Sequence, residues 1–443
     1  MAPHGRATTA ARAGSKPEDV RRHNLGTLFS HLHVSGPLSR AELTGRMGLN
    51  RSTIGGLVAQ LTDLGLVEEE RPAGAHAGAG RPSLVVRPRA DGAQVLAADV
   101  QVDRAVVGLV QVGGRVLTRR YRRLAGSRSP SAVAGVVRRL VDAVLADPLA
   151  SGRIVGMGLS LPGVVRHADG FIRFAPNLGW VDQPFGDLLD RQLAGTLCGH
   201  RVRVGNDADL GVLAEHLRGA AIGHDDVVFI AGWVGVGGGC IVGGRPLHGS
   251  GGYAGELGHL PLVPDGRPCR CGARGCLETE IGAPAIARAL GLTDVGTDEL
   301  VLAVRAEAGT RPGALDGVAR YLGLGLAGLV NLFNPRLIIV DGLLQEVMSV
   351  AGDVVRATLA QAALAAAAEQ VIITPPRLGR DAVLVGASEL AWQDLLADPA
   401  GALFGSRAAS GPVSAGTGSP RASSPAAPAA PVPQSVGSGT MSG

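Results

Sequence analysis

The sequence predicts an α/β protein that carries a small helical domain at its N-terminus. Three observations lead to this prediction. Strand-like and helix-like segments alternate from about residue 94 to 397, and three short capped helices precede them. Residues 1–90 contain 12 Arg and Lys against 7 Asp and Glu, in a chain whose net charge is +4. The basic excess therefore lies at one end, as expected for a domain that meets a polyanion.

Composition sets the limits of the fold. The chain has 443 residues, of which 46% are apolar, enough for a sizeable core. It has no apolar run of 18 residues and no apolar segment near the N-terminus, so we expect a cytoplasmic protein without membrane association. The expected divisions are a disordered arm (1–17), a winged helix-turn-helix domain (18–90), an α/β domain (94–397) and a disordered tail rich in Pro, Ala, Ser and Gly (399–443).

The segment 20–66 predicts three short helices. Ser39 and Glu42 form an S-x-x-E capping box, and Asn50 is a good N-cap for the third helix. Segments 66–70 and 83–89 read as two strands of a wing. Helix spacing alone leaves a protein-interaction module equally possible, and the wing with the basic excess favours DNA. The expected DNA-contacting residues are Arg40, Arg51, Ser52, Thr53, Gly56, Gln60 and Arg81.

The α/β part is predicted from near-continuous apolar strands that alternate with helices. Segments such as RIVGMGLSL and RLIIVDGLL are typical of strands buried on both faces. Sheets of this type bind ligands outside the carboxyl ends of their strands. The pair Asn206-Asp207 follows one such strand, so it can hold a hydroxyl, although Asn-Asp is also ordinary turn chemistry. The loop around Asn177 is expected to close over something small.

The strongest motif is a group of four soft ligands. Cys269, Cys271 and Cys276 lie close together, and His259 precedes them by ten residues. Three thiolates and one imidazole are the donor set of a closed tetrahedral zinc site. We therefore predict Zn²⁺ as the cofactor.

Two glutamates flank the predicted metal ligands. Glu256 lies three residues before His259, and Glu278 lies two after Cys276. A metal site would hold these carboxylates where they could accept hydrogen bonds from hydroxyl groups. The pattern alone leaves it equally possible that both are solvated loop residues.

Together these residues resemble the ROK family, which contains bacterial sugar kinases and winged helix-turn-helix repressors that share their fold. The motif GELGH…CRCGARGCLE carries the resemblance most specifically, and the likeness runs from about residue 20 to 397. It implies a two-lobed actin/hexokinase-like domain, with zinc on the four ligands named above. It also implies sugar hydroxyls bound by Asn177, Asn206, Asp207, Glu256, His259 and Glu278. In the kinases, the residue matching Asp207 is the general base.

The stretches that match the kinases' phosphate loops are altered. The kinases carry Asp-x-Gly-Gly-Thr after the first strand, where this chain reads Asp99-Val-Gln-Val-Asp103. The second loop, Gly-Thr-Gly-x-Gly-Gly-Gly, begins here with Trp233-Val234, and Asp341 stands where the kinases usually have glycine. Phosphoryl transfer depends on positioning and electrostatics, so we expect no catalytic residue and a vestigial base at Asp207.

The sequence therefore predicts a sugar-responsive transcriptional regulator that represses carbohydrate genes and is not an enzyme. The expected partners are an operator in double-stranded DNA, a sugar or sugar phosphate, and a second copy of the chain, as a homodimer or higher homo-oligomer. Two alternatives stay open: an active ATP-dependent sugar kinase with an added DNA-binding domain, and a regulator whose sugar pocket is vestigial.

Overall fold

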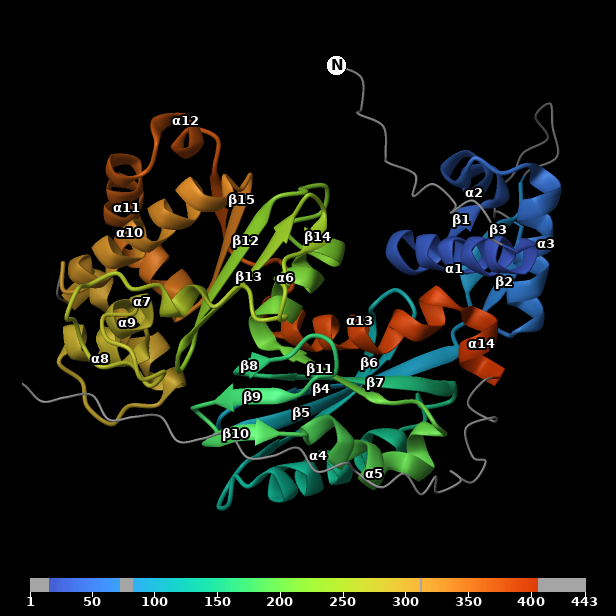
Figure 1. The fold of residues 1–443 in the computed structure, drawn as a ribbon, viewed down its shortest axis with the longest axis horizontal. Helices are drawn as coiled ribbons and strands as arrows, with labels where there is room; N and C mark the ends of the chain where they lie inside the picture. Colours follow the sequence, from blue (N-terminus) through green and yellow to red (C-terminus); the bar gives the residue numbers. More distant parts are fainter. Residues whose placement is uncertain (1–15, 72–82, 311–312, 405–443) are drawn as a thin grey trace, which may run out of the picture. The chain divides into compact units, whose positions relative to one another are not determined.

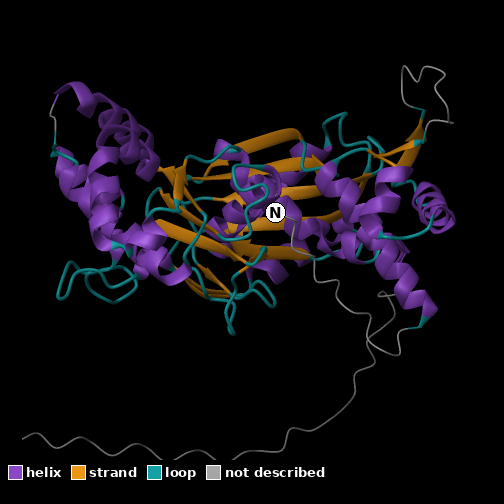
Figure 2. Cartoon of the chain, turned by 90° about the horizontal axis from the view of Figure 1, so that it is seen from above, coloured by secondary structure: helices purple, strands orange, loops and turns teal. Residues whose placement is uncertain are grey.

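The computed structural model describes residues 16–71, 83–310 and 313–404 (Figure 1). Within these ranges, no helix combines the length and the apolar composition that crossing a bilayer requires. The α/β architecture with an N-terminal winged helix-turn-helix is confirmed. Figure 2 shows the strands of the larger sheets side by side, with helices packed around them.

The N-terminal domain consists of three helices and a three-stranded sheet. Its elements are α1 (Pro17–Ser35), β1 (Leu38–Ser39), α2 (Arg40–Met47), α3 (Arg51–Asp63), β2 (Val67–Glu70) and β3 (Val85–Pro88). The predicted capping box is present, because Ser39 accepts from the Glu42 amide and Glu42 accepts from the Ser39 amide. Asn50 caps α3 through the Thr53 amide. Strands β2 and β3 pair antiparallel as the wing, and the loop with Arg81 lies outside the described residues.

The first lobe of the α/β part is a five-stranded sheet with the order β11-β7-β4-β5-β6. Its strands are β4 (Ala93–Val100), β5 (Arg104–Gln111), β6 (Val116–Arg123), β7 (Arg153–Leu161) and β11 (Val202–Asn206). Helices α4 (Pro130–Leu145) and α5 (Phe185–Leu197) cover one face, and α13 (Ala382–Ala397) covers the other. A smaller sheet contains β8 (Val164–Val165), β9 (Ile172–Ala175) and β10 (Trp180–Gln183).

The second lobe repeats this topology with the order β14-β13-β12-β15-β16. Its strands are β12 (Val227–Gly232), β13 (Val236–Val242), β14 (Arg245–Pro246), β15 (Leu337–Gly342) and β16 (Ile372–Thr374). In each lobe the first strand pairs parallel with a later strand and antiparallel with the next one. The helices on its outer side are α7 (Leu277–Ile281), α8 (Ala283–Leu290), α9 (Thr297–Thr310), α10 (Asp316–Phe333), α11 (Leu343–Ala362) and α12 (Ala365–Ala368).

Helix α6 (Asp207–Arg218) lies between the lobes. It packs on β12 and β13 of the second lobe and on α13, which covers the first. The contact with α13 is close, because a Cβ at Gly386 would stand 2.0 Å from the Leu210 carbonyl oxygen. The end of one lobe's strand β11 therefore leads directly into a helix that both lobes share.

The structure extends past the boundary predicted for the C-terminal end of the α/β domain. Residues 399–404 form a short helix, α14 (Pro399–Phe404), where we predicted disorder from 399. Leu403 is buried in the core that α1 and α13 build, and Asp398 accepts from the Gly401 amide. This prediction was wrong because one apolar side chain and one cap hold the segment, which composition alone does not reveal.

Gly158 on β7 predicts a stability effect. A Cβ there would stand 1.8 Å from the Ala387 carbonyl oxygen, so Gly158→Ala must push α13 off the sheet. Overpacking of this kind costs about 1–3 kcal/mol, and we expect a lower free energy of unfolding in urea titrations. Gly195→Ala in α5 is the matched control, because no atom lies within 4 Å of its Cβ position. It should stabilise the chain by about 0.5–1 kcal/mol. An unchanged stability in Gly158→Ala would contradict the packing described.

Candidate functional site

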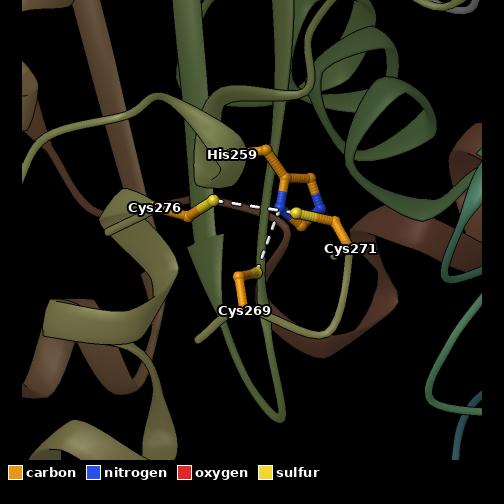
Figure 3. A group of neighbouring side chains, drawn as sticks. All are labelled: His259, Cys269, Cys271 and Cys276. Carbon is orange, nitrogen blue, oxygen red and sulfur yellow. Dashed lines mark hydrogen bonds between the residues drawn. The ribbon is translucent and has the colours of Figure 1, made fainter. Parts of the chain in front are cut away.

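The four predicted metal ligands converge on one point (Figure 3). Their ligand atoms all lie within 4.8 Å of one another. Cys269 Sγ lies 3.6 Å from His259 Nδ1, and Cys271 Sγ lies 3.7 Å from Cys276 Sγ. A disulfide needs about 2.0 Å, so the thiols are free. The cluster could hold a metal ion.

Backbone geometry explains why these residues meet. His259 ends a short 3-10 turn (Leu257–His259), and Cys276 pairs with Pro261 in an isolated bridge. The turn between the cysteines closes through the Cys269 amide, which donates to the Ala273 carbonyl. Gly272 and Gly275 have φ of +95° and +68°, a backbone conformation that glycine adopts readily and that lets the chain turn tightly here.

Glu278 and Asn177 meet beside the metal cluster. Glu278, on α7, accepts a hydrogen bond of 2.9 Å from the Val236 amide, and Cys269 Sγ lies 3.6 Å from its other oxygen. Asn177, in the turn between β9 and β10, lines the same pocket. The Arg270 guanidinium donates to the Asn177 side-chain oxygen. The loop that carries the three cysteines therefore contacts the first lobe.

Asp207 and Glu256 belong to a second, acidic group at the start of α6. Burial raises the pKa of Asp207 to about 7, and the charges of Asp99 and Glu256 add to this. Burial and the same Glu256 charge raise the pKa of Asp209 to about 7. Burial also raises the pKa of Glu256, while the His259 charge lowers it and Glu278 raises it. Glu256 therefore lies close enough to His259 and Glu278 to interact electrostatically with both.

Asn206 makes hydrogen bonds to the backbone through both the oxygen and the nitrogen of its side-chain amide. Its side-chain oxygen accepts from the Ala208 and Asp209 amides, and its amide nitrogen donates to the Gly163 carbonyl at 2.9 Å. The residue therefore caps α6 and ties that cap to β8 and β9 through Gly163. The cap fixes the start of α6, where Asp207 is the first helical residue.

A family model identifies the family of the domain that contains this site. The model described as "ROK family" matches residues 95–394. This chain belongs to the ROK family. The match includes both lobes, the metal cluster and the acidic group.

Individual relatives of the ROK family divide into two kinds. A glucokinase of Halalkalibacterium halodurans is 32% identical over 328 residues, which is 66% of this chain and 96% of the relative. A xylose repressor of Bacillus subtilis is 28% identical over 375 residues, or 84% of this chain and 95% of the repressor. A crystal structure of a ROK family transcriptional regulator, a homologue of the Escherichia coli MLC protein, has a TM-score of 0.72 at 24% identity. It covers 88% of this chain and 99% of its own, and it shows the fold.

The altered first phosphate loop of this ROK domain is filled by side chains. Gln101 Nε2 donates to Asp99 at 2.6 Å, Arg104 Nε donates to Gln101 Oε1 at 2.7 Å, and Ser160 Oγ donates to Asp99 at 3.1 Å. Asp103, which we expected to bring negative charge to this place, is instead exposed. Gln101 rather than Asp103 therefore occupies the space beside the buried Asp99 carboxyl.

The second phosphate loop and Asp341 also differ from an open phosphate-binding site. Val236 donates to Glu278, so this backbone amide is already engaged. Asp341 lies buried at the end of β15, and burial raises its pKa to about 6. It lines a hollow with Trp233, Arg305 and Glu346. Sequence reasoning missed Arg270 and the Gln101–Asp99–Ser160 chain, although Arg270 stands between two ligand cysteines.

The residues predicted to contact DNA differ in exposure and in whether other side chains already bind them. Arg51 and Ser52 are exposed at the start of α3, and no atom lies within 4 Å of a Cβ at Gly56. Thr53 is half-buried beside them. Arg40 is paired with Glu69 on β2, and Gln60 accepts from Arg21 at 3.0 Å. The first turns of α3 are therefore the open part of this surface.

Proposed function

We propose that this chain is a transcriptional repressor of carbohydrate genes whose affinity for operator DNA changes when a sugar or sugar phosphate binds between its lobes. The observation that carries the proposal is a winged helix-turn-helix on the same chain as a ROK domain. The similarity to xylose repressors extends over 84% of the chain, whereas that to the glucokinase covers 66%. A regulator of this kind acts in the cytoplasm, where the chromosome lies.

The DNA contacts follow from the open surface of α3. Arg51, Ser52 and Thr53 stand at the N-terminal end of this helix, which in helix-turn-helix proteins enters the major groove. Gly56 allows close approach, Arg81 of the wing is proposed for the minor groove, and Arg40 and Gln60 position the helix while contacting phosphates. A homodimer would place two such helices on half-sites about one helical turn apart, or a multiple of it.

The metal that fits the cluster is zinc. With Zn–S near 2.3 Å and Zn–N near 2.0–2.1 Å, the edges of a tetrahedron measure about 3.8 Å between sulfurs and about 3.6 Å between sulfur and nitrogen. Two of the six edges, at 3.7 and 3.6 Å, agree with these values, and all four ligand atoms lie within 4.8 Å of one another. A bound zinc would fix the loop that carries Glu256, His259 and Glu278. These three, with Asn177, Asn206 and Asp207, would hold the sugar hydroxyls.

The test is an operator titration with the full chain. A duplex selected by the protein from a random pool is titrated by fluorescence anisotropy, with and without glucose, xylose and their phosphates. We expect one of these sugars to change the operator Kd about 5–150-fold, the usual range of allosteric coupling. Specific binding without any response to the panel would refute the sensing function, and no specific binding would refute the DNA function.

A sugar kinase is the second candidate, because Asp207 is retained and its pKa of about 7 suits a general base. We nevertheless expect no ATP-dependent turnover, since Gln101 fills the first loop and Val234 replaces the threonine of the second. A coupled ADP-release assay with glucose and xylose should stay at the rate without sugar. Sugar-dependent ADP release that Asp207→Asn abolishes would establish the kinase.

A further inference from the structure

A buried polar cluster lies where the N-terminal domain meets the ROK domain. It consists of His33 on α1, Arg218 at the end of α6 and Glu389 on α13, whose side chains are 1%, 11% and 6% exposed. Apolar residues of α1 and α13, including Leu32 and Trp392, surround it in one continuous core. Buried charges are retained at a cost, so a cluster at this junction calls for an explanation.

The hydrogen bonds of the cluster fix its geometry. Arg218 donates to Glu389 Oε1 through Nε at 2.9 Å and through Nη2 at 2.7 Å. The Gly113 amide donates to His33 Nδ1 at 3.2 Å. His33 Nε2 lies 2.8 Å from Glu389 Oε2 and 2.6 Å from Arg218 Nη2, so the imidazole contacts both members of the ion pair. Arg218 also donates to the His33 carbonyl at 3.2 Å, so it grips both the side-chain partner and the backbone of α1.

Arg218 is connected to the sugar site by a single helix. Asp207 begins α6 and Arg218 ends it, 11 residues later, over about 16 Å at 1.5 Å per residue. Asn206 caps this helix at the sugar end, and the helix packs on β12 and β13. A short, capped and packed helix moves as one body. A ligand that shifts Asp207 must therefore displace Arg218 or strain its bonds.

We propose that Arg218 is the positioning residue through which occupancy of the sugar site reaches the winged helix, by way of α6, Glu389 and His33. The inference rests on the proposed function and adds the route of the signal. When α6 shifts, the Arg218 guanidinium loses its alignment with the Glu389 carboxylate and the His33 carbonyl. Helix α1 then changes its position on α13. Coupling is reciprocal, so DNA on α3 changes the sugar affinity by the same factor.

The experiment compares the full chain with variants that keep the buried site neutral. Arg218→Met/Glu389→Gln removes the arginine fork together with the charge that it balances. Arg218→Lys keeps one charge but cannot form the paired bonds. Arg203→Met is the matched control, because Arg203 pairs with Asp394 on the same helix α13 without touching α1, and both side chains are more than 40% exposed.

The quantity measured is the ratio of operator Kd with and without saturating sugar, using glucose and xylose on the selected duplex. Hydrogen exchange of the α1 amides is measured with the same sugars. We expect the ratio to fall below about twofold in Arg218→Met/Glu389→Gln, to be intermediate in Arg218→Lys and to be unchanged in Arg203→Met. Sugar binding itself, measured by calorimetry, should persist in all three, and the sugar-induced change in α1 exchange should disappear with the ratio.

A purely structural role would lower the melting temperature and leave the ratio as it is. A variant that folds, binds both ligands and keeps the full ratio overturns the inference. If instead the unmodified chain shows no sugar response on its operator, the proposed function fails first, so the two failures are distinct. Should Arg218→Met/Glu389→Gln not fold, a full ratio in Arg218→Lys alone would overturn the proposal.

Discussion

Cys276→Ser is expected to remove both the bound metal and the sugar affinity. Cys276 Sγ is buried within 4.8 Å of the other three ligand atoms, and a serine hydroxyl is a poor ligand for a thiophilic ion. Without the metal, the turn between His259 and Cys276 loses its brace, and Glu278 is no longer held against the Val236 amide. We expect zinc per chain to fall from about one to near zero, by plasma mass spectrometry, and sugar affinity to fall at least about 100-fold by calorimetry.

The matched control is Cys198→Ser, which makes the same chemical change at an exposed cysteine outside the cluster. It should keep the zinc and the sugar affinity. Operator binding without sugar should survive in Cys276→Ser, because the apolar core that holds the N-terminal domain, around Phe29 and Leu61, contains none of the four ligand residues. Full zinc content in Cys276→Ser would contradict the assignment of the cluster, and unchanged sugar affinity would contradict its role as a brace.

Asp207→Asn is expected to weaken sugar binding and to stabilise the empty protein. A hydrogen bond to a charged group is worth about 1.5–3 kcal/mol, so the sugar Kd should rise about 10- to 150-fold. The same substitution removes a carboxylate whose pKa burial, Asp99 and Glu256 raise to about 7. A binding residue held in an unfavourable environment typically shows this exchange of stability for function. Calorimetry of sugar binding checks the first effect, and urea titration checks the second.

The pH dependence of this stabilisation has a definite sign. The carboxyl has a pKa of about 7 in the folded chain and of 3.8 as its ordinary value, so the folded state binds the proton more tightly. Stability therefore falls as the pH rises from about 4 through about 7, and Asp207→Asn removes part of that fall. At pH 8 the variant should be more stable by about 2–4 kcal/mol, where the upper figure is a shift of about three units at roughly 1.4 kcal/mol each.

The lower figure of that range applies if Asp209 and Glu256 take part of the destabilisation, because the charges of Asp207, Asp209 and Glu256 repel one another. Asp353→Asn is the control, because this carboxyl is fully exposed on α11 and its removal should leave the pH dependence unchanged. Equal stabilities of the unmodified chain and Asp207→Asn at pH 8 would show that the carboxyl is not held in the buried environment described.

The elements and the metal cluster were predictable because each depends on residues close together in the sequence. Ser39 and Glu42 identify their helix start within four positions, and the cysteines identify their knuckle within eight. Gly158 and Gly386 carried no such signal. Gly158 meets Ala387 on α13, which arrives more than 220 residues later, and Gly386 on α13 meets Leu210 on α6. The same holds for Leu403, whose burial depends on α1 at the other end of the fold.

The site residues also divide into those that nearby sequence could predict and those whose contacts depend on distant parts of the chain. Spacing suggested that Glu256 and Glu278 could serve a ligand, but it could not indicate that Glu278 holds the Val236 amide or that Arg270 reaches Asn177. The loss of the phosphate-loop glycines was legible, while the residue that fills the space was not. Asp103 is the more obvious obstacle in the sequence, yet it points to solvent and Gln101 makes the bonds.

The side chains that fill the first phosphate loop have a consequence for how the protein measures its ligand. An enzyme depletes the molecule that it binds, so its occupancy depends on turnover and on the energy charge of the cell. Under the proposed function, Gln101 bonded between Asp99 and Arg104 prevents phosphorylation, so a bound sugar would leave unchanged and occupancy would follow its free concentration. Gene expression can then track supply itself, independently of how much ATP is at hand.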